Sequence, residues 1–307
     1  MSAPITTRNR RVDLTQSAFT LLCGASPRAM LDLYNEGGSA VQLYSGPAPW
    51  CLTFDGGDHV EADALATNAT FLASTDGSIA ARVNVTANAA VKTIFSASDL
   101  SANEFMQFGL DASEKLFATL RTAAAVQWTL TCTAALVPGQ WYRVKLVHNG
   151  TTPVLYVDGA QWPQTFSVTT DKTAWIAGLS NIDTGRIGSI NTNAAAAEAE
   201  WWVGQIRDLQ VYDGTAADKL TPDLNRVLVA NFKLQDGTGT TVTDSSGNAL
   251  DGAFGAGAAA PVWDMWNAYK SLGAASGFLW DTGVPRDCIY AYTTDTGIVV
   301  EVTQGWR

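Results

Sequence analysis

The sequence predicts an all-β protein built from antiparallel sheets. Short runs rich in β-branched and aromatic residues recur roughly every 8 to 12 residues between turn residues, the spacing of an antiparallel sandwich. Asn149-Gly150 and Asp158-Gly159 supply the positive φ angles that tight hairpin turns require. Helix signals are nearly absent. One exception is residues 264–273, where an Asp at the start and a Gly at the end predict one or two helical turns.

The clearest hairpin lies at residues 141–161, which read WYRVKLVHNGTTPVLYVDGAQ. Successive side chains of a strand point to opposite faces of its sheet. The alternation therefore predicts two sets of side chains: Tyr142, Val144 and Leu146 on one face, and Arg143 and Lys145 on the other.

This hairpin resembles the central strands of laminin-G-like, concanavalin A-type lectin domains, through its leading tryptophan followed by HNG and LYVDG. Segments 52–62 and 78–86 resemble the family's first strands, and 201–215 resembles its closing strand. Segment 227–263 is similar to one usually found at the start of such domains, and here it comes last. The resemblance implies an antiparallel jelly-roll sandwich, concanavalin A-like, over residues 50–263. Lectins, hydrolases and adhesion modules share this fold.

The two chain ends carry further strand signals. Residues 30–45 predict a hairpin that turns at Glu36-Gly37-Gly38, and 289–303 predict a second hairpin joined by Asp295-Thr296-Gly297. Each end alone has exposed sheet edges and little core, so it needs a partner. We predict a small discontinuous β-sandwich made from residues 1–49 and 266–307, interrupted by the jelly-roll domain at 50–265. The alternative is that the terminal strands extend the inner sheets.

The ending VPRDCIYAYTTDTGIVVEVTQG, together with an asparagine-containing strand near the start, resembles a small β module common in tailed-phage virion proteins. The resemblance implies a virion structural protein, either a capsid decoration (cement) protein or a tail or fibre adhesin. It would assemble with other virion proteins in the host cytoplasm, as a homo-oligomer such as a trimer, and face a host-surface glycan. The alternative is a free carbohydrate-binding lectin or adhesion module.

Charge and hydropathy exclude several classes of protein. A formal net charge of -10 over 307 residues, with a pI near 4.6, argues against a nucleic-acid-binding surface. No apolar run reaches the roughly 18 residues of a membrane helix, so we expect no membrane insertion. No signal peptide is evident, which predicts a protein that is not secreted. The four cysteines lack C-x-x-C spacing, which argues against zinc.

Carboxylates suggest one metal hypothesis and no catalytic site. Asp55 and Asp58 are candidate calcium ligands, because calcium prefers hard oxygen donors and related domains often hold this ion at a sheet rim. Asp55-Gly-Gly-Asp58 is also an ordinary turn. No Glu-x-Asp-x-x-Glu triplet of β-glucan hydrolases occurs, and Glu198 and Glu200 share a face only if 194–201 is a strand. We therefore expect no enzyme activity and no cofactor other than calcium.

Two groups of residues are candidate binding residues. Eleven tryptophans include four candidates for stacking on sugar rings: Trp162, Trp175, Trp201 and Trp202. The alternative for each is packing, and on a strand one of Trp201 and Trp202 must face outward. Arg8, Arg10 and Arg11 form a basic segment suited to an acidic partner, or else a solvated tail.

Overall fold

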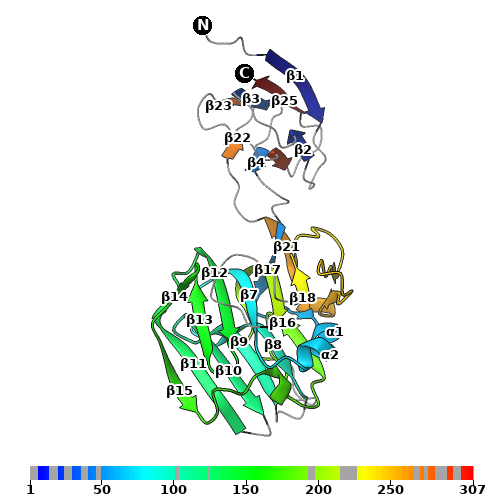
Figure 1. The fold of residues 1–307 in the computed structure, drawn as a ribbon. Helices are drawn as coiled ribbons and strands as arrows, with labels where there is room; N and C mark the ends of the chain where they lie inside the picture. Colours follow the sequence, from blue (N-terminus) through cyan, green and yellow to red (C-terminus); the bar gives the residue numbers. More distant parts are fainter. Residues whose placement is uncertain are drawn as a thin grey trace. The chain divides into compact units, whose positions relative to one another are not determined.

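The computed structural model describes residues 6–13, 20–23, 30–35, 41–45, 50–100, 104–122, 125–192, 198–214, 227–265, 270–272, 276–280, 289–292 and 299–306. The chain divides into two compact units, Met1–Pro49 with Met265–Arg307, and Trp50–Asp264. Within the described ranges, no helix is long and apolar enough to cross a membrane. Nearly all regular structure is antiparallel β-sheet, which confirms the predicted fold class (Figure 1).

In the terminal unit, the described strands form two four-stranded sheets. The first has the order β1 (Thr6–Asp13), β25 (Val299–Trp306), β3 (Met30–Asn35) and β23 (Ser276–Trp280). The second has the order β2 (Thr20–Cys23), β24 (Ile289–Tyr292), β4 (Val41–Ser45) and β22 (Lys270–Leu272). In both sheets, every neighbouring pair joins one strand from the start of the chain to one from its end. Each end therefore supplies the hydrogen-bonding partners of the other.

The two hairpins predicted in this unit are wrong. Strands β3 and β4 lie in different sheets, and so do β24 and β25. Turn residues predict that the chain reverses, but they do not determine whether the returning strand pairs with the previous one or enters a second sheet. Here the partner strands come from the opposite chain end.

The inner unit is a sandwich of two larger sheets. One has the order β15 (Gln164–Thr169), β11 (Ala125–Ala135), β10 (Lys115–Thr122), β9 (Phe105–Leu110), β8 (Lys92–Ser98), β16 (Thr184–Ile187), β6 (Val60–Glu61), β20 (Gly252–Phe254) and β19 (Thr241–Val242). The other has the order β14 (Ala160–Gln161), β13 (Pro153–Val157), β12 (Trp141–His148), β7 (Gly77–Val85), β17 (Val203–Asp213), β5 (Trp50–Asp55) and β21 (Val262–Met265), and β18 (Val227–Phe232) pairs with β17.

Large apolar side chains fill the space between these sheets. The largest fully buried apolar ones are Phe54, Phe71, Phe95, Phe108, Trp128, Trp202 and Phe232. Among the described residues of this unit, four short helices connect strands: α1 (Asp63–Ala66), α2 (Ala69–Leu72), η1 (Ile176–Gly178) and η2 (Gly257–Ala259). The Asn68 side chain caps α2 by accepting the N–H groups of Thr70 and Phe71.

The central hairpin follows the prediction, whereas the helical turns predicted at 264–273 are wrong for the described ends of that range, and 266–269 lies outside the described residues. Strand β12 pairs with β13, and Val144 and Leu146 are fully buried while Arg143 is exposed. Residues 262–265 and 270–272 are strands instead of helical turns. The reason is tertiary: β21 pairs with β5, and the Asp264 carboxylate accepts the Thr53 hydroxyl at 2.9 Å.

Candidate functional site

The eight-stranded sheet has a polar face directed away from the core, which we call the outer face. Along β7, burial alternates: Ile79, Ala81, Val83 and Val85 lie in the core, and Ala80, Arg82 and Asn84 lie on the outer face. The same alternation places Arg143 and Lys145 of β12 on the outer face, as predicted. Strands β12, β7 and β17 lie side by side in the inner unit (Figure 1).

Cross-strand register groups the outer-face side chains into three rows. The first row holds Trp141, Asn84, Gln205 and Thr53. The second row, which we call the arginine row, holds Arg143, Arg82 and Arg207. The third row holds Tyr156, Lys145, Ala80, Gln210 and Asn231. Side chains directly opposite each other in neighbouring antiparallel strands are close enough to interact.

A β-bulge adds one carboxylate to the arginine row. The register of β17 against β7 shifts between Arg207 and Gln210, and Asp208 adopts a left-handed φ of 52°. Its carboxylate accepts the Arg207 Nε–H at 3.0 Å and lies 3.4 Å from the Arg82 Nε. The Gln235 amide donates to the other oxygen at 3.1 Å. Asp208 is therefore shared between two arginines and held from a third direction.

The three arginines differ in burial. Arg207 is only 3% exposed, and burial lowers its pKa, an effect that Asp208 opposes. Arg82 has 39% of its side chain exposed, and Arg143 is exposed. Like charges directly opposite on neighbouring strands repel, and the Asp208 carboxylate between Arg207 and Arg82 opposes this repulsion.

A hollow of about 200 Å³ lies on this face. We call it the Ala80 hollow, because the small side chain of Ala80 leaves space among longer neighbours. Its lining consists of Ala80, Ala81, Arg82, Arg143, Asp208 and Gln210. The polar groups in this lining can donate and accept hydrogen bonds on several sides of a bound molecule.

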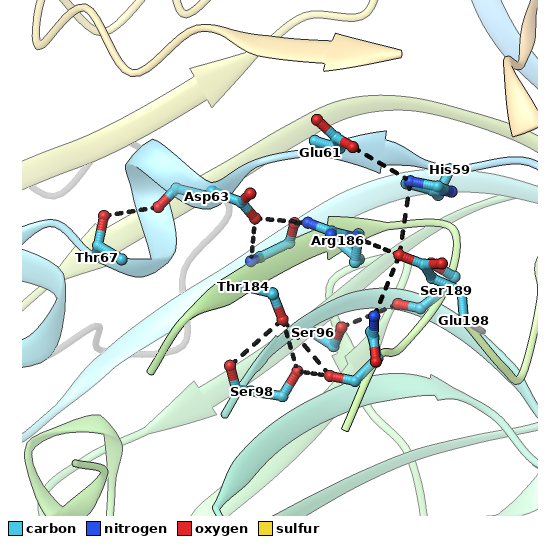
Figure 2. A network of polar contacts seen from close by, with 12 residues as sticks. His59, Glu61, Asp63, Thr67, Ser96, Ser98, Thr184, Arg186, Ser189 and Glu198 are labelled. Carbon is cyan, nitrogen blue, oxygen red and sulfur yellow. Dashed lines mark hydrogen bonds and ion pairs between the residues drawn. The ribbon is translucent and has the colours of Figure 1, made fainter. Parts of the chain in front are cut away.

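A second polar cluster, the Arg186 network, joins His59, Asp63, Arg186 and Glu198 (Figure 2). The buried Arg186 guanidinium donates Nε–H to Glu198 at 3.0 Å and Nη1–H to Asp63 at 2.5 Å. It also donates to the Gly185 carbonyl at 2.8 Å. Beneath it, Ser96 and Ser98 of β8 bond the 189–191 segment. The network ties β6, α1, β8 and β16 together at one part of the nine-stranded sheet.

Electrostatics identifies the Arg186 network as a structural cluster. Burial favours a protonated Glu198, but the hydrogen bond from Arg186, a backbone hydrogen bond and the charges of His59 and Arg186 together outweigh it and leave the Glu198 pKa lowered. Burial lowers the His59 pKa, although Glu198 lies 3.8 Å away. An ionised Glu198 bound to arginine cannot act as a general acid near neutral pH. Its charges compensate one another within the protein.

The structure separates the four candidate tryptophans. Trp202 is fully buried and Trp175 is 4% exposed, so the glycan-contact prediction is wrong for both. Trp175 stacks on His148, with ring centroids 4.9 Å apart, because the 170–179 segment folds over the core. Trp162 is half-buried and packs against the core. Trp201 is half-buried beside the His59 ring, so the outward member of the Trp201–Trp202 pair is Trp201.

The candidate calcium ligands take part in a turn. The Asp58 carboxylate accepts the Asp55 N–H at 2.7 Å, and the Asp55 carboxylate accepts the Gly57 N–H at 3.0 Å. Burial raises the pKa of Asp58. Among the described residues, no group of three or more His, Cys, Asp or Glu side chains is arranged to hold a metal. Calcium at this turn stays a prediction that rests on sequence.

The other predicted residues belong to other elements of the chain. Arg8, Arg10 and Arg11 lie in β1, opposite Gln304, Val302 and Glu301 of β25, so they belong to a paired strand and not to a free arm. Their partner-binding role stays a prediction. Glu198 and Glu200 do not form a carboxylate pair, because Glu198 bonds Arg186 while Glu200 accepts the Gln107 amide.

Sequence reasoning missed Arg82, Arg207 and Asp208. The alternation in SIAARVNV does place Arg82 on the polar face of its strand. What the sequence does not show is that β7 lies between β12 and β17 in a register that aligns three arginines, or that a bulge adds Asp208.

Comparisons with known proteins agree on the fold. A model of the concanavalin A-like lectin/glucanases superfamily matches residues 54–219. A candidate carbohydrate binding protein from Bacteroides ovatus ATCC 8483 is similar with a TM-score of 0.51 and 12% identity, over 85% of this chain and 93% of that one. The Ruminococcus gnavus IT-sialidase CBM40 bound to α2,3 sialyllactose is similar with a TM-score of 0.47 and 18% identity, over 56% and 96%.

No curated protein sequence matches the chain. The superfamily model nevertheless spans more than half of the 307 residues and covers most of both sheets of the inner unit. This chain belongs to the concanavalin A-like lectin/glucanases superfamily.

Proposed function

We propose that this protein is a non-catalytic, lectin-like module that binds a carbohydrate on the outer face of its eight-stranded sheet. The observation that carries the proposal is the Ala80 hollow, which is lined by guanidinium, amide and carboxylate groups on a rigid sheet. Planar polar side chains suit sugar hydroxyls, because each presents fixed donors or acceptors. Sites built on regular elements hold such groups in place before the ligand arrives.

Aromatic residues on the same face support this proposal. Tyr156 and Lys145 lie opposite each other in the third row, and Trp141 begins the first row. Aromatic rings beside polar groups are typical of small-molecule sites, where the rings cover apolar ligand surface and the polar groups fix its orientation. The amide side chains of Asn84 and Gln205 continue the first row, and the Asn84 amide donates to the Gln205 oxygen at 3.5 Å.

The test is glycan binding by the full chain, with a variant that fills the hollow. We expect saturable binding of at least one glycan on an array, confirmed by titration calorimetry. Ala80→Leu should abolish it by occupying the hollow. Ala135→Leu is the matched control, because Ala135 is exposed on the other sheet. Binding that Ala80→Leu leaves unchanged, or no binding to any glycan, would contradict the proposal.

Display on a virion stays a second proposal that rests on the resemblance of the terminal segments. Those segments lie outside the 54–219 match. The interleaved pairing of both chain ends in one unit favours a separate attachment module over an extension of the inner sheets. Light scattering tests it: the full chain should form a defined homo-oligomer and residues 50–264 a folded monomer. A monomeric full chain would argue for a free lectin.

A further inference from the structure

Resting on the proposed function, we infer that the bound saccharide is anionic, and that Arg82 and Arg143 bind its carboxylate or sulfate group beside the Ala80 hollow. Arginine presents a planar set of N–H donors that matches the oxygens of such groups in pairs. In this arrangement the sugar ring lies in the hollow, and its anionic group contacts the arginine row.

The charge pattern of the row supports this inference. The chain has 19 Lys and Arg residues against 29 Asp and Glu, so a row of three aligned arginines departs from the acidic character of the protein. Asp208 contributes a carboxylate to the row, where it contacts Arg207 and Arg82. Lys145 adds a further cation in the neighbouring row. At the end of the row, the Asp158 carboxylate accepts the backbone N–H of Arg143 at 2.8 Å, and this hydrogen bond holds the carboxylate at the Asp158-Gly159 turn.

Asp208 lies nearer to the buried arginine of the row than to the exposed ones. Its carboxylate is closer to the buried Arg207, at 3.0 Å, than to Arg82, at 3.4 Å. Gln235 holds its second oxygen on the side of the 233–235 segment. Arg82 and Arg143 lie on the two neighbouring strands, and both line the hollow. An anion placed there meets two guanidinium groups that cross-strand pairing has already brought together.

Size and surroundings favour a sugar over a larger anion. The hollow of about 200 Å³ is smaller than the roughly 300 to 1,000 Å³ typical of drug-sized ligands, and it suits a single ring. Gln210 also lines it, and an amide can bond ring hydroxyls while the arginines bond the charged group.

The experiment uses the full chain and ligand-observed NMR titrations of methyl glycosides. The anionic probes are those of glucuronate, galacturonate, N-acetylneuraminate and galactose 6-sulfate, and the neutral probes are those of glucose and galactose. We expect at least one anionic probe to bind about tenfold or more tightly than its neutral counterpart, the scale of a charge-assisted hydrogen bond. Comparing the carboxylate probes with the sulfate probe shows which of the two anionic groups the site binds. Raising the salt concentration should weaken only the anionic probes.

Variants connect the preference to the row. Arg82→Gln and Arg143→Gln should each weaken the anionic probe about tenfold or more and leave any neutral binding unchanged. Arg121→Gln makes the same change on the other sheet and should have no effect. Thermal unfolding checks that each variant is folded.

The outcomes separate this inference from the proposed function. Equal binding of anionic and neutral probes, or an anion preference that neither variant changes, would overturn the inference and leave a neutral glycan site. Loss of all binding only in Ala80→Leu would still place that neutral site in the hollow. No binding of any probe, together with no binding on the glycan array, would overturn both.

Discussion

The inner unit holds two arginine sites with opposite charge arrangements. In the Arg186 network, one buried guanidinium meets the carboxylates of Asp63 and Glu198 (Figure 2). In the arginine row, two guanidinium groups, those of Arg207 and Arg82, share the carboxylate of Asp208, and Arg143 lies opposite Arg82 on the next strand. In the first site, one arginine contacts two carboxylates, and in the second, two arginines contact one carboxylate.

The difference separates a structural role from a binding role. A buried charge is tolerated when partners and hydrogen bonds compensate its desolvation, as at Arg186. Aligned like charges weaken a sheet, and departures from local stability rules concentrate at functional sites. We therefore expect substitutions at Arg186 to change stability, and substitutions at the open side of the row to change binding.

The largest effect on stability is expected for Arg186→Gln. Removing the guanidinium leaves Glu198 ionised at a mostly buried position and breaks the link to Asp63. We expect the free energy of unfolding to fall by about 2–3 kcal/mol, below the usual 3–5 for a fully buried pair, because the Asp63 side chain is 46% exposed. Urea denaturation measures this. A loss under about 1 kcal/mol would show that the network is not structural.

A smaller effect is expected from pH, through two buried histidines. Burial lowers the pKa of His59 and of His148, so below about pH 6.5 the unfolded chain takes up protons that the folded chain does not. The free energy of unfolding should be fully retained above that pH and fall as the pH decreases, by at most about 1.4 kcal/mol per pH unit for each histidine.

Denaturation between pH 7.5 and 5 tests the sign, with His59→Phe as a variant that should show a shallower slope. Anion binding at the arginine row should persist over the same range, because guanidinium groups do not titrate there. A stability that does not change with pH would contradict the neutral assignment of His148, whose Nε2 lies 2.9 Å from the Lys172 carbonyl.

Strand periodicity made much of the inner unit predictable. The alternation at 141–148 correctly placed Val144 and Leu146 in the core and Arg143 on the opposite face. The Asp158-Gly159 turn has the positive φ angles expected of it, 49° and 82°. These features depend on neighbouring residues, so local sequence carries the information.

Long-range register was not predictable from the same patterns. Arg82 and Arg207 become neighbours only because β17 pairs with β7 across more than a hundred residues. Trp175 was a candidate ligand contact because it lies in an irregular segment, yet that segment folds over the core and buries the ring. The terminal hairpins failed for a related reason, since their strands pair with the opposite chain end.

The smallest effect on stability is expected at Arg143, where the two arginine sites differ most. Arg143→Gln removes an exposed guanidinium that lies opposite Arg82, and its backbone N–H can still bond Asp158. The free energy of unfolding should change by no more than about 0.5 kcal/mol, with a rise favoured because a like-charge pair is lost. Urea denaturation of Arg143→Gln and Arg186→Gln under the same conditions measures the difference directly. A loss above about 1 kcal/mol at Arg143 would mean that the row stabilises the sheet, and the alignment of the arginines would then need no ligand to explain it.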